Sequence, residues 1–348
     1  MSEKPDHNGA RRVTLRDIAK ELGVSHVTVS KALRNQSGAS EELKARIQAK
    51  AEEMGYQPDP MLAALSHYRK SSKTKPVQAS LAWINTWTDP NQLRQFKEFD
   101  LYWQGAAESA RRLGFKLQEF STAEIPLRRL ETILKTRNIQ GILLPPLRDP
   151  VEGLQAFDWS SFAVVRFGQA IPFPETHFVT GAQMADTMLA FDRAHQLGYE
   201  RIGFVCEYWR MRFFGVGYSW AQKTLPPKQQ LPLLTLNQTD DFEHQQSVFE
   251  KWIAKAKPDA ILTDNSNTLK MLSNLGYRIP EDLGLATTSI HDTPIDAGID
   301  QRPFEIGRAA VRTLVSLLVE KNFGIPDCRN EILIEGQWID GSMLPPRT

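Results

Sequence analysis

The feature that most constrains the fold of this chain is a series of short helix signals within residues 13–65. Thr14 is a favourable N-cap residue, and Asp17, three positions later, completes the pattern of a capping box. The apolar spacing of a helix then continues up to Gly23, which supplies the left-handed stop. The sequence therefore predicts a first helix from Leu15 to Leu22.

A second and a third helix follow closely. Ser25 is placed to cap a helix from His26 to Leu33. Ser40 precedes a longer helix that ends at Met54, before Gly55. Two helices joined by a short turn have the layout of a helix-turn-helix. The apolar positions that can share one interior are Ile18, Ala19, Leu22, Val24, Val29, Ala32, Leu33, Leu43, Ile47 and Met54.

That interior leaves an outward stripe on the second helix. His26 is four positions before Ser30, and Val27 is likewise four positions before Lys31. Lys31 can donate to guanine O6 and N7, and His26 to a purine N7, while Val27 offers an apolar surface to a thymine methyl group. The stripe therefore predicts a helix that reads bases in the major groove. The alternative is an ordinary three-helix surface with solvated charges.

A specific family resemblance rests on this stretch. Residues 13–33 carry the motif V-T-L-x-D-I-A-x-x-x-G-V-S-x-x-T-V-S-K-A-L, and Gly55-Tyr56-Gln57-Pro58 follows, which resembles the DNA-binding headpiece of the lactose-repressor (LacI/GalR) family. The resemblance implies that His26, Val27 and Lys31 read the operator. Family members often carry Arg at the position of Lys31, and Lys lacks the planar fork, so weaker guanine selectivity is expected. Further expected DNA-binding residues are Thr14, Ser25, Thr28, Ser30, Asn35 and Tyr56.

A fourth, short helix is predicted over residues 59–66. Asp59 suits its N-cap and Pro60 its first position. In the resembling family this hinge helix forms against its dimer mate in the minor groove, where a leucine enters between base pairs. Leu65 matches that leucine, Leu62 lies on the same helix face, and both are expected to bind DNA. Asp59 replaces the usual Asn, and a linker helix packed on the next domain is the alternative.

Charge distinguishes the N-terminal part from the rest of the chain. Residues 1–76 hold 14 Lys and Arg against 9 Asp and Glu, whereas the remainder holds 28 against 32. A basic module on a mildly acidic body suits a nucleic-acid reader joined to a sensor. Residues 1–12 are expected to be a disordered arm and residues 67–76 a basic linker.

Composition argues against several other classes of protein. Two cysteines, Cys206 and Cys328, imply no disulfide framework and lie in no metal-ligand spacing, so no metal or cofactor is expected. No stretch approaches 18 apolar residues, and the N-terminus lacks an apolar signal region. A cytoplasmic, nucleoid-associated protein with no membrane contact is expected. The common P-loop, G-x-S-x-G and H-E-x-x-H motifs are absent, so no enzyme is predicted.

Short apolar runs alternate with helical stretches after the linker, which favours parallel sheets with helices on both faces. The predicted strands are 79–84, 116–120, 141–144, 163–167, 201–206, 233–236, 260–263 and 285–288. The predicted helices are 102–113, 127–136, 183–197, 242–256 and 268–275, with a long helix over 304–321 that crosses back to the first lobe. Two lobes are predicted, the first over about 77–177 and 302–324 and the second over about 178–301 and 325–343.

Segments such as Ile279-Pro280-Glu281-Asp282-Leu283-Gly284 and Asp300-Gln301-Arg302-Pro303 resemble the family's regulatory core in order and spacing. The resemblance implies a helix-turn-helix headpiece with a hinge helix, followed by an α/β, periplasmic-binding-protein-like core over residues 77–343. It also implies an effector cleft between two parallel-sheet lobes, and dimerisation through the core.

The cleft is where the sequence departs from the family. The family's Arg, three residues before a Gly-aromatic pair, aligns with Phe214, and Arg212 lies two residues earlier. The family's Asn-Asp pair is reversed, as Asp264-Asn265. A buried Arg and Asp normally bracket sugar hydroxyls, so these changes weaken an ordinary sugar-binding interpretation and favour aromatic contacts. The expected effector-binding residues are Trp87, Arg212, Phe214, Phe242, Asp264 and Asn265.

Two functions from different classes follow. The first is a sequence-specific transcription regulator, expected to be a repressor. It would bind a pseudo-palindromic operator in double-stranded DNA as a homodimer, with an affinity set by a small-molecule effector, expected to be a carbohydrate. The second is an architectural or weakly selective DNA-bending protein whose core only dimerises. A ligand-binding protein without DNA activity would leave residues 13–65 unexplained.

Overall fold

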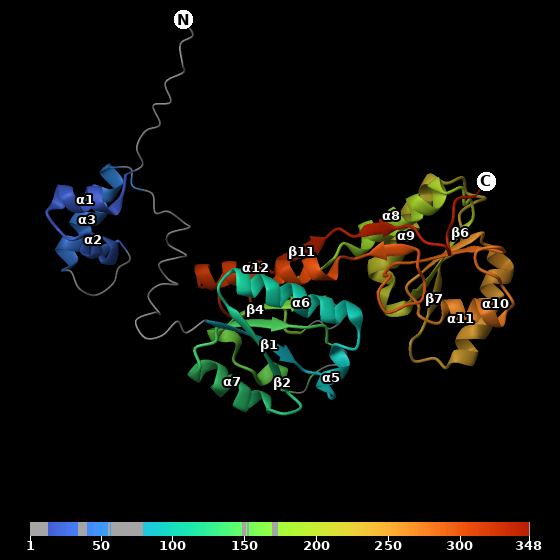
Figure 1. Cartoon of the computed structure of the whole chain (residues 1–348), viewed down its shortest axis with the longest axis horizontal. Coiled ribbons are helices and arrows are strands. Elements are labelled where there is room, and N and C mark those ends of the chain that lie inside the picture. Colours follow the sequence, from blue (N-terminus) through green and yellow to red (C-terminus); the bar gives the residue numbers. More distant parts are fainter. Residues whose placement is uncertain are drawn as a thin grey trace, which may run out of the picture. The chain divides into compact units, whose positions relative to one another are not determined.

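The computed structural model describes residues 13–33, 40–54, 56, 79–147, 151, 153–168 and 173–347. The chain forms two compact units, Met1–Val77 and Gln78–Thr348. The first unit contains the blue helices of Figure 1, and the second contains two sheets with their helices.

The first unit is a small helical domain. Its described helices are α1 (Leu15–Leu22), α2 (His26–Ala32) and α3 (Glu41–Glu53). The predicted capping box is present, because the backbone N–H of Thr14 donates to Asp17 Oδ2 at 2.8 Å and Asp17 N–H donates to Thr14 Oγ1 at 3.4 Å. Every apolar residue predicted for the interior lies in one cluster, with Ile18, Val29 and Ile47 fully buried. The helix-turn-helix prediction is therefore confirmed.

The second unit contains two six-stranded sheets. The first sheet has the order β11-β5-β4-β3-β1-β2, and the second has the order β12-β10-β9-β8-β6-β7. All neighbouring strands are parallel except the antiparallel pair β10 and β12. The strands are β1 (Ser80–Asn85), β2 (Lys116–Ser121), β3 (Gly141–Leu144), β4 (Ala163–Phe167), β5 (His177–Gly181), β6 (Ile202–Glu207), β7 (Leu234–Leu236), β8 (Ala260–Thr263), β9 (Gly284–Thr287), β10 (Gly298–Asp300), β11 (Glu331–Ile334) and β12 (Gln337–Ile339).

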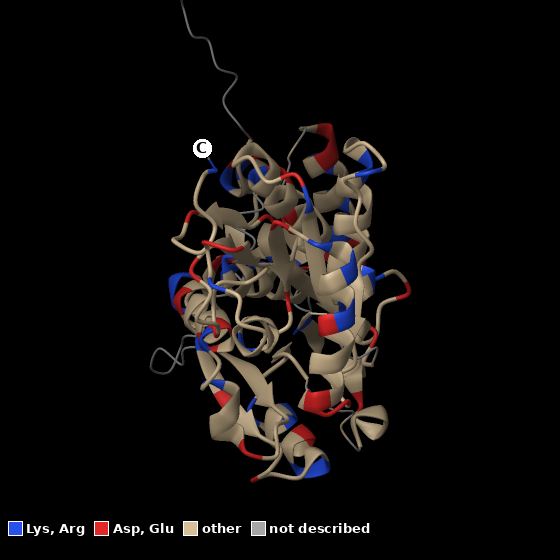
Figure 2. Ribbon diagram, turned by 90° about the vertical axis from the view of Figure 1, so that its right-hand side faces the viewer, with Lys and Arg blue, Asp and Glu red and all other residues tan. Residues whose placement is uncertain are grey.

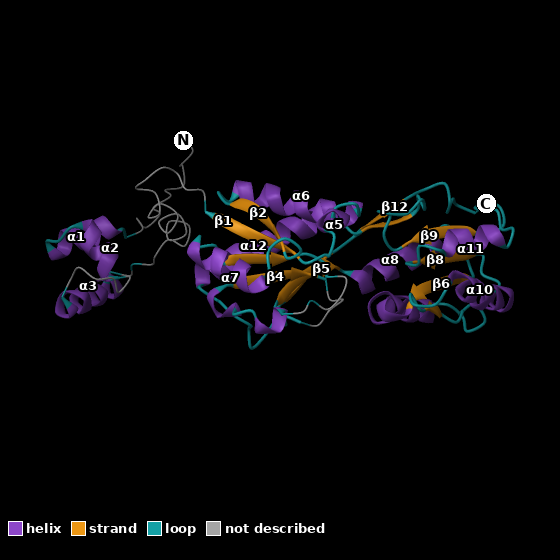
Figure 3. Cartoon of the chain, turned by 90° about the horizontal axis from the view of Figure 1, so that it is seen from below, coloured by secondary structure: helices purple, strands orange, loops and turns teal. Residues whose placement is uncertain are grey.

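Helices cover both faces of each sheet (Figure 3). They are α5 (Pro90–Leu93), α6 (Lys97–Arg112), α7 (Leu127–Thr136), α8 (Gln183–Gln196), α9 (Val216–Ala221), α10 (Phe242–Ala256), α11 (Thr268–Asn274) and α12 (Pro303–Glu320). Short 3-10 turns lie at Leu154–Ala156, Trp159–Ser161, Tyr208–Arg210 and Gln222–Thr224, and a π-helical turn lies at Met211–Gly215. This is the predicted architecture of two parallel-sheet α/β lobes.

The boundaries between the lobes differ from the prediction. Strand β5 pairs with β4, and β11 pairs with β5, so both complete the first sheet. The first crossover therefore follows Gly181 rather than Phe178, and residues 331–334 belong to the first lobe rather than the second. Strands β5, β10, β11 and β12 were not predicted. Of these, β11 and β12 lie at sheet edges and have no buried residue, so they lack the apolar run that marks a buried strand.

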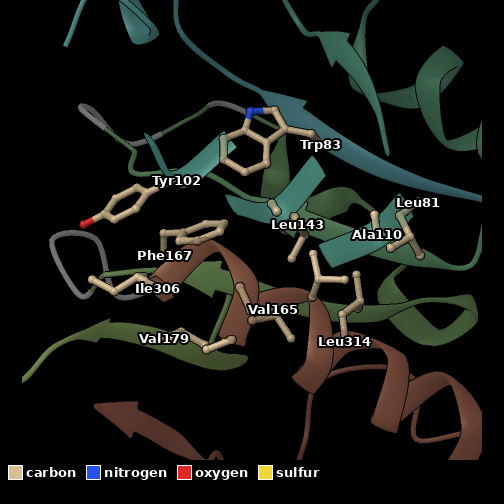
Figure 4. Packing of buried hydrophobic residues seen from close by; sticks show 14 of the residues in the cluster. Leu81, Trp83, Tyr102, Ala110, Leu143, Val165, Phe167, Val179, Ile306 and Leu314 are labelled. Atoms are coloured by element: carbon tan, nitrogen blue, oxygen red, sulfur yellow. The ribbon is translucent and has the colours of Figure 1, made fainter. Parts of the chain in front are cut away.

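Helix α12 crosses back to the first lobe and packs on α6 in its main apolar core. The two helices approach closely at Gly105, where an added Cβ would lie 1.9 Å from the carbonyl oxygen of Phe304. Figure 4 shows the aromatic part of this core, in which the rings of Tyr102 and Phe167 stack with centroids 5.1 Å apart. Trp83 and Phe167 continue the cluster at 5.2 Å. The apolar core therefore reaches the carboxyl end of β4, where Phe167 is the last residue of the strand.

One buried carboxylate lies where the chain passes between the lobes. Asp186 is 2% exposed, and its Oδ1 accepts a hydrogen bond from the backbone N–H of Gly336 at 2.8 Å. An added Cβ on Gly181 would lie 3.6 Å from Asp186 Oδ2 and 2.8 Å from Gln301 Oε1. The chain passes between the lobes three times, after β5, after β10 and after β11. Gly181, Gln301 and Gly336, one from each of these segments, lie next to Asp186. Burial raises the pKa of Asp186 to about 6.

Candidate nucleic-acid interface and effector cleft

The structure separates the two faces of α2. Its N-cap is Ser25, whose Oγ accepts a hydrogen bond from the backbone N–H of Thr28 at 3.0 Å. Val29 is fully buried in the headpiece core, whereas His26 is exposed and Val27 is 50% exposed. Lys31 is half-buried, as expected for a long side chain whose stem lies along the helix. His26 and Val27 therefore offer the solvent a surface that the helical interior does not use.

The other predicted DNA-binding residues have varied environments. Thr14 is exposed, but its hydroxyl donates to Asp17 Oδ2 at 2.7 Å within the capping box. Ser25 is exposed and Thr28 is half-buried, with their hydroxyl oxygens 2.9 Å apart, and Ser30 is also half-buried. Tyr56 packs against the headpiece core. The predicted hinge helix and the DNA contacts Asn35, Leu62 and Leu65 lie outside the described residues.

In the second unit, the loops after β1 and β9 meet between the lobes. Asp292 accepts hydrogen bonds from the backbone N–H groups of Lys97 at 2.7 Å and Glu98 at 3.0 Å, at the start of α6. Glu98 Oε2 accepts a bond from Ser289 Oγ at 3.2 Å, and its Oε1 accepts one from the Tyr102 hydroxyl at 2.7 Å. The carboxyl edges of the two sheets therefore face one another, which is where ligands bind in parallel α/β folds.

A polar cluster occupies the second-lobe side of this cleft. Asp264 follows β8, and its side chain is fully buried, with Oδ1 accepting a bond from the backbone N–H of Glu207 at 2.8 Å. Asn265 is 2% exposed, and its side-chain amide donates to Glu207 Oε1. Asn265 Oδ1 accepts a bond from the Asn267 backbone N–H at 2.9 Å. Two predicted effector residues are therefore held together with Glu207, which was not predicted although it ends a strand.

Arg210 provides the positive charge of this cluster. Its Nη1 lies 4.0 Å from Asp264 Oδ2, and its guanidinium lies 4.8 Å from the ring centroid of Trp209. Burial raises the pKa of Asp264 to about 6, and Arg210 opposes that shift. Burial and the neighbouring Glu98 raise the pKa of Tyr102 well above its usual value, and Arg210 opposes this shift too. Arg210 thus acts electrostatically on both lobes.

Two of the predicted effector contacts, Phe214 and Arg212, lie in different environments. Phe214 is 1% exposed and lies in the apolar core of the second lobe, so it is a core residue rather than an effector contact. Arg212 is exposed and stacks on Phe213 with its guanidinium 4.6 Å from the ring centroid. Both residues lie in the π-helical turn Met211–Gly215, which buries Phe214 and leaves Arg212 exposed.

The two predicted aromatic contacts are packed against their own lobes. Trp87 is 7% exposed in the first-lobe core, and its indole N–H donates to the Pro146 carbonyl at 2.9 Å. Phe242 begins α10, packs against the core beneath it, and carries Lys270 Nζ 4.2 Å from its ring centroid. The more exposed aromatic side chains near the strand ends are Phe96, Tyr208 and Trp209.

The charged residues of the core do not gather by sign on the face drawn in Figure 2. On the face drawn in Figure 2, Lys and Arg residues are interspersed with Asp and Glu residues. Among the described residues, no group of three or more His, Cys, Asp or Glu side chains has the geometry to hold a metal ion. Over the same residues, no helix is long and apolar enough to span a membrane.

Comparison with known proteins gives two family matches. Residues 14–59 match the profile described as bacterial regulatory proteins, lacI family. Residues 191–337 match the profile described as periplasmic binding protein-like domain. The HTH-type transcriptional regulator GntR of Pseudomonas aeruginosa is 36% identical over 77 residues, which is 22% of either chain. The chain thus aligns with about a fifth of the length of that curated relative.

Solved structures share the fold over most of the chain. A transcriptional regulator CelR–cellobiose complex superposes with a TM-score of 0.57 and 18% identity, covering 95% of this chain and 100% of that one. The lac repressor dimer bound to operator and the anti-inducer ONPF gives a TM-score of 0.54 and 15% identity, covering 96% of this chain and 100% of that one. These structures show the shared fold. The two profile matches identify the chain as a member of the LacI family of transcription regulators, with a periplasmic-binding-protein-like core.

Proposed function

We propose that this protein is a repressor that binds a pseudo-palindromic operator as a homodimer. We further propose that a small molecule in the cleft between its lobes sets its affinity for DNA. The observation that carries the proposal is the outward face of α2, where His26 and Val27 are exposed beside Lys31 while Val29 is fully buried. A helix-turn-helix reads base edges with this part of its second helix.

Three further observations support the regulatory part of the proposal. The cleft is bordered by the carboxyl edges of both sheets, where a bound molecule would contact both lobes. Similar folds occur in a regulator complexed with cellobiose and in a repressor dimer bound to its operator. A ligand that binds one arrangement of the lobes more tightly shifts the population toward it, and DNA affinity follows through coupling. Membership in a family of transcription regulators is consistent with the prediction that the chain is not an enzyme.

Selection of the full-length protein on random double-stranded DNA at near-physiological salt tests the DNA-binding part. We expect recovery of a site with two-fold symmetry, since a dimer presents two copies of α2. Recovery of bent or A·T-rich DNA without a symmetric sequence would instead support the architectural alternative.

Lys31→Ala makes the test residue-specific. If Lys31 reads guanine, the variant should lose selectivity at one position in each half-site, at a cost of about 1–3 kcal/mol per contact. Lys50→Ala is the matched control, because Lys50 forms an ion pair with Glu53 on α3 at 2.8 Å. A uniform loss of affinity across all sequences in the Lys31 variant would assign Lys31 to phosphate contact.

The regulatory part needs a separate measurement. Operator affinity of the full-length protein is measured with and without each member of a panel of sugars and sugar derivatives. A change in affinity produced by one compound class, with a matching increase in the melting temperature, is the expected result. Sequence-specific binding that no compound changes would leave the DNA-binding proposal intact and remove the effector.

A further inference from the structure

Asp186 lies at the hinge of the core, where the chain passes three times between the two sheets. Its Oδ1 accepts a hydrogen bond from the backbone N–H of Gly336, in the third crossover, at 2.8 Å. Its Oδ2 is buried and has no hydrogen-bond partner among the described residues. A buried acceptor without a donor is unfavourable. The side chain is therefore only half satisfied, at the place about which one lobe would turn relative to the other.

The side-chain oxygen of Gln301, in the second crossover, lies close to the same point. The Nε2 of Gln301 donates to the Thr288 carbonyl at 2.9 Å, which leaves Oε1 directed toward Gly181 in the first crossover. A Cβ added to Gly181 would lie 2.8 Å from Gln301 Oε1 and 3.6 Å from Asp186 Oδ2. Two side-chain oxygens therefore approach the same glycine. Both are acceptors while Asp186 is ionised, whereas a protonated carboxyl group is a donor.

The surroundings of Asp186 favour its protonated form. The side chain is buried, and burial is the main cause that raises the pKa of Asp186 to about 6. The N–H of Gly336 opposes that shift in pKa, Glu335 in the third crossover adds to it, and Arg302 in the second crossover opposes it. Asp186 can therefore gain and lose a proton at mildly acidic pH while the protein remains folded.

The other charged groups around α8 are paired or exposed. Asp300, at the end of β10, accepts a hydrogen bond from the Arg302 backbone N–H at 2.8 Å and lies 3.1 Å from His291 Nε2. The remaining charged side chains on the elements packed beside α8 are Arg193 with Asp340, Arg210 with Asp264 and Glu207, and the exposed Arg212 and Lys223. Because His291 lies beside the second crossover, a test of Asp186 needs a control for this histidine.

We propose that Asp186 is a positioning residue through which protons set the arrangement of the two lobes. In the protonated form Oδ2 donates to Gln301 Oε1, so Asp186 joins the second and third crossovers beside the first. When the proton leaves, the two oxygens repel each other, and an arrangement that separates them and admits water to Asp186 is favoured. A proton is therefore a ligand of the arrangement seen here, and acidification increases the population of that arrangement.

The size of the effect follows from the pKa of Asp186 in the two arrangements. The pKa is about 6 in the arrangement seen here and returns to 3.8 where water reaches the carboxyl group. The ratio of the two populations should then change about fourfold between about pH 7.5 and about pH 5.5, toward the arrangement seen here at the lower pH. This inference concerns the hinge and does not depend on the proposed function.

The test measures the distance between the lobes by pulsed electron spin resonance on the full-length protein. One spin label is attached to Cys328, which is exposed and precedes β11 of the first lobe. The second is attached through Lys255→Cys, at an exposed position of α10 in the second lobe, while the buried Cys206 stays unlabelled. Dilution with unlabelled protein removes distances between protomers. We expect two distances, whose populations shift about fourfold between the two pH values. A distance distribution that does not change with pH would overturn the proposal.

Asp186→Asn then tests the residue itself. The amide keeps an acceptor for the Gly336 N–H and offers Gln301 Oε1 a permanent donor, so the variant should show the acid population at both pH values. Asp192→Asn, at an exposed position of the same helix, is the matched control and should respond as the wild type does. His291→Gln should also keep the response. An undiminished response in Asp186→Asn, or its loss in His291→Gln alone, would overturn the role of Asp186.

Operator affinity of the unlabelled protein at the same two pH values separates this inference from the proposed function. If the lobes set DNA affinity, the affinity should change by up to about fourfold in the wild type and remain constant in Asp186→Asn. A shift of the lobes with constant operator affinity would support the role of Asp186 at the hinge and contradict the proposed coupling of the lobes to DNA.

Discussion

Asp292 in the second lobe accepts a hydrogen bond from the backbone N–H of Lys97 in the first, with a distance of 2.7 Å. Helix α6 has no side-chain cap of its own, because its N-cap residue is Phe96. The first turn of α6 is therefore satisfied by a residue that is 195 positions away in sequence. The same bond fixes the lobes to each other at one end of the cleft.

Removal of this distant cap should weaken the core. In Asp292→Ala the N–H groups of Lys97 and Glu98 lose their acceptor, so the free energy of unfolding should fall by about 1 kcal/mol, as for other lost N-caps. Urea denaturation of the full-length protein measures the change. Asp327→Ala, at an exposed aspartate, is the control and should have little effect. Equal stability of the two variants would show that α6 does not depend on Asp292.

The buried carboxylate of Asp186 predicts a pH dependence of stability. Its pKa is raised from 3.8 to about 6 in the folded protein, so between these values the folded state holds a proton that the unfolded chain has released. Stability should therefore fall as pH rises through this window, by on the order of 3 kcal/mol from this group alone. The loss should be complete above the folded pKa.

Asp186→Asn isolates that contribution. The amide oxygen can still accept the Gly336 N–H, but the side chain no longer ionises. The variant should match the wild type near pH 4 and exceed its stability above pH 6. Thermal unfolding at a series of pH values measures the difference. Parallel curves for the two proteins across the range would contradict a raised pKa at Asp186.

Phe214 and Arg212 should respond differently to truncation although they lie in one turn. Phe214→Ala leaves a cavity in the second-lobe core, and the free energy of unfolding should fall by about 3–5 kcal/mol. Arg212→Ala should change it by about 0.5 kcal/mol or less, because the side chain is exposed. Phe214→Leu keeps most of the volume and should leave effector affinity unchanged. A selective loss of affinity in that variant would restore Phe214 as an effector contact.

The close approach of α6 and α12 predicts intolerance of side chains at Gly105. The Cβ of Gly105→Ala would lie 1.9 Å from the Phe304 carbonyl oxygen, so the helices would have to separate. We expect a loss of at least about 2 kcal/mol in the free energy of unfolding. Gln104→Ala, on the exposed side of the same helix, is the control and should be tolerated. Chemical denaturation of both variants provides the comparison.

Features that depend on neighbouring residues could be predicted from the sequence. The capping box of Thr14, the stop at Gly23 and the interior around Ile18 and Val29 all depend on positions a few residues apart. The alternation of strands and helices was also readable, because short apolar runs such as β1, β6 and β8 are each followed by a helix. The headpiece and the two-lobed core were therefore predictable.

Features that depend on distant residues could not be predicted. Helix α6 begins at Lys97, five residues before the predicted start at Tyr102, because Asp292 supplies its cap. Strand β11 has little apolar burial of its own and exists through pairing with β5. In the cleft, sequence placed Asp264 and Asn265 correctly at the end of β8 but did not reveal that they orient Glu207.

The path of the chain through the core has a consequence for its synthesis. The first sheet and its helices begin with β1, but β11 belongs to the same sheet and α12 to the same apolar core. A ribosome that has made residues 79–181 has therefore released five of the six strands of this lobe without the helix that buries their inner face. Most of the second lobe is translated in the interval, and only its edge strand β12 comes after β11, whereas the headpiece already has every residue of its described core. The first lobe therefore stays incomplete while most of the second is made, and a chaperone would meet its exposed apolar surface until residues 303–334 emerge.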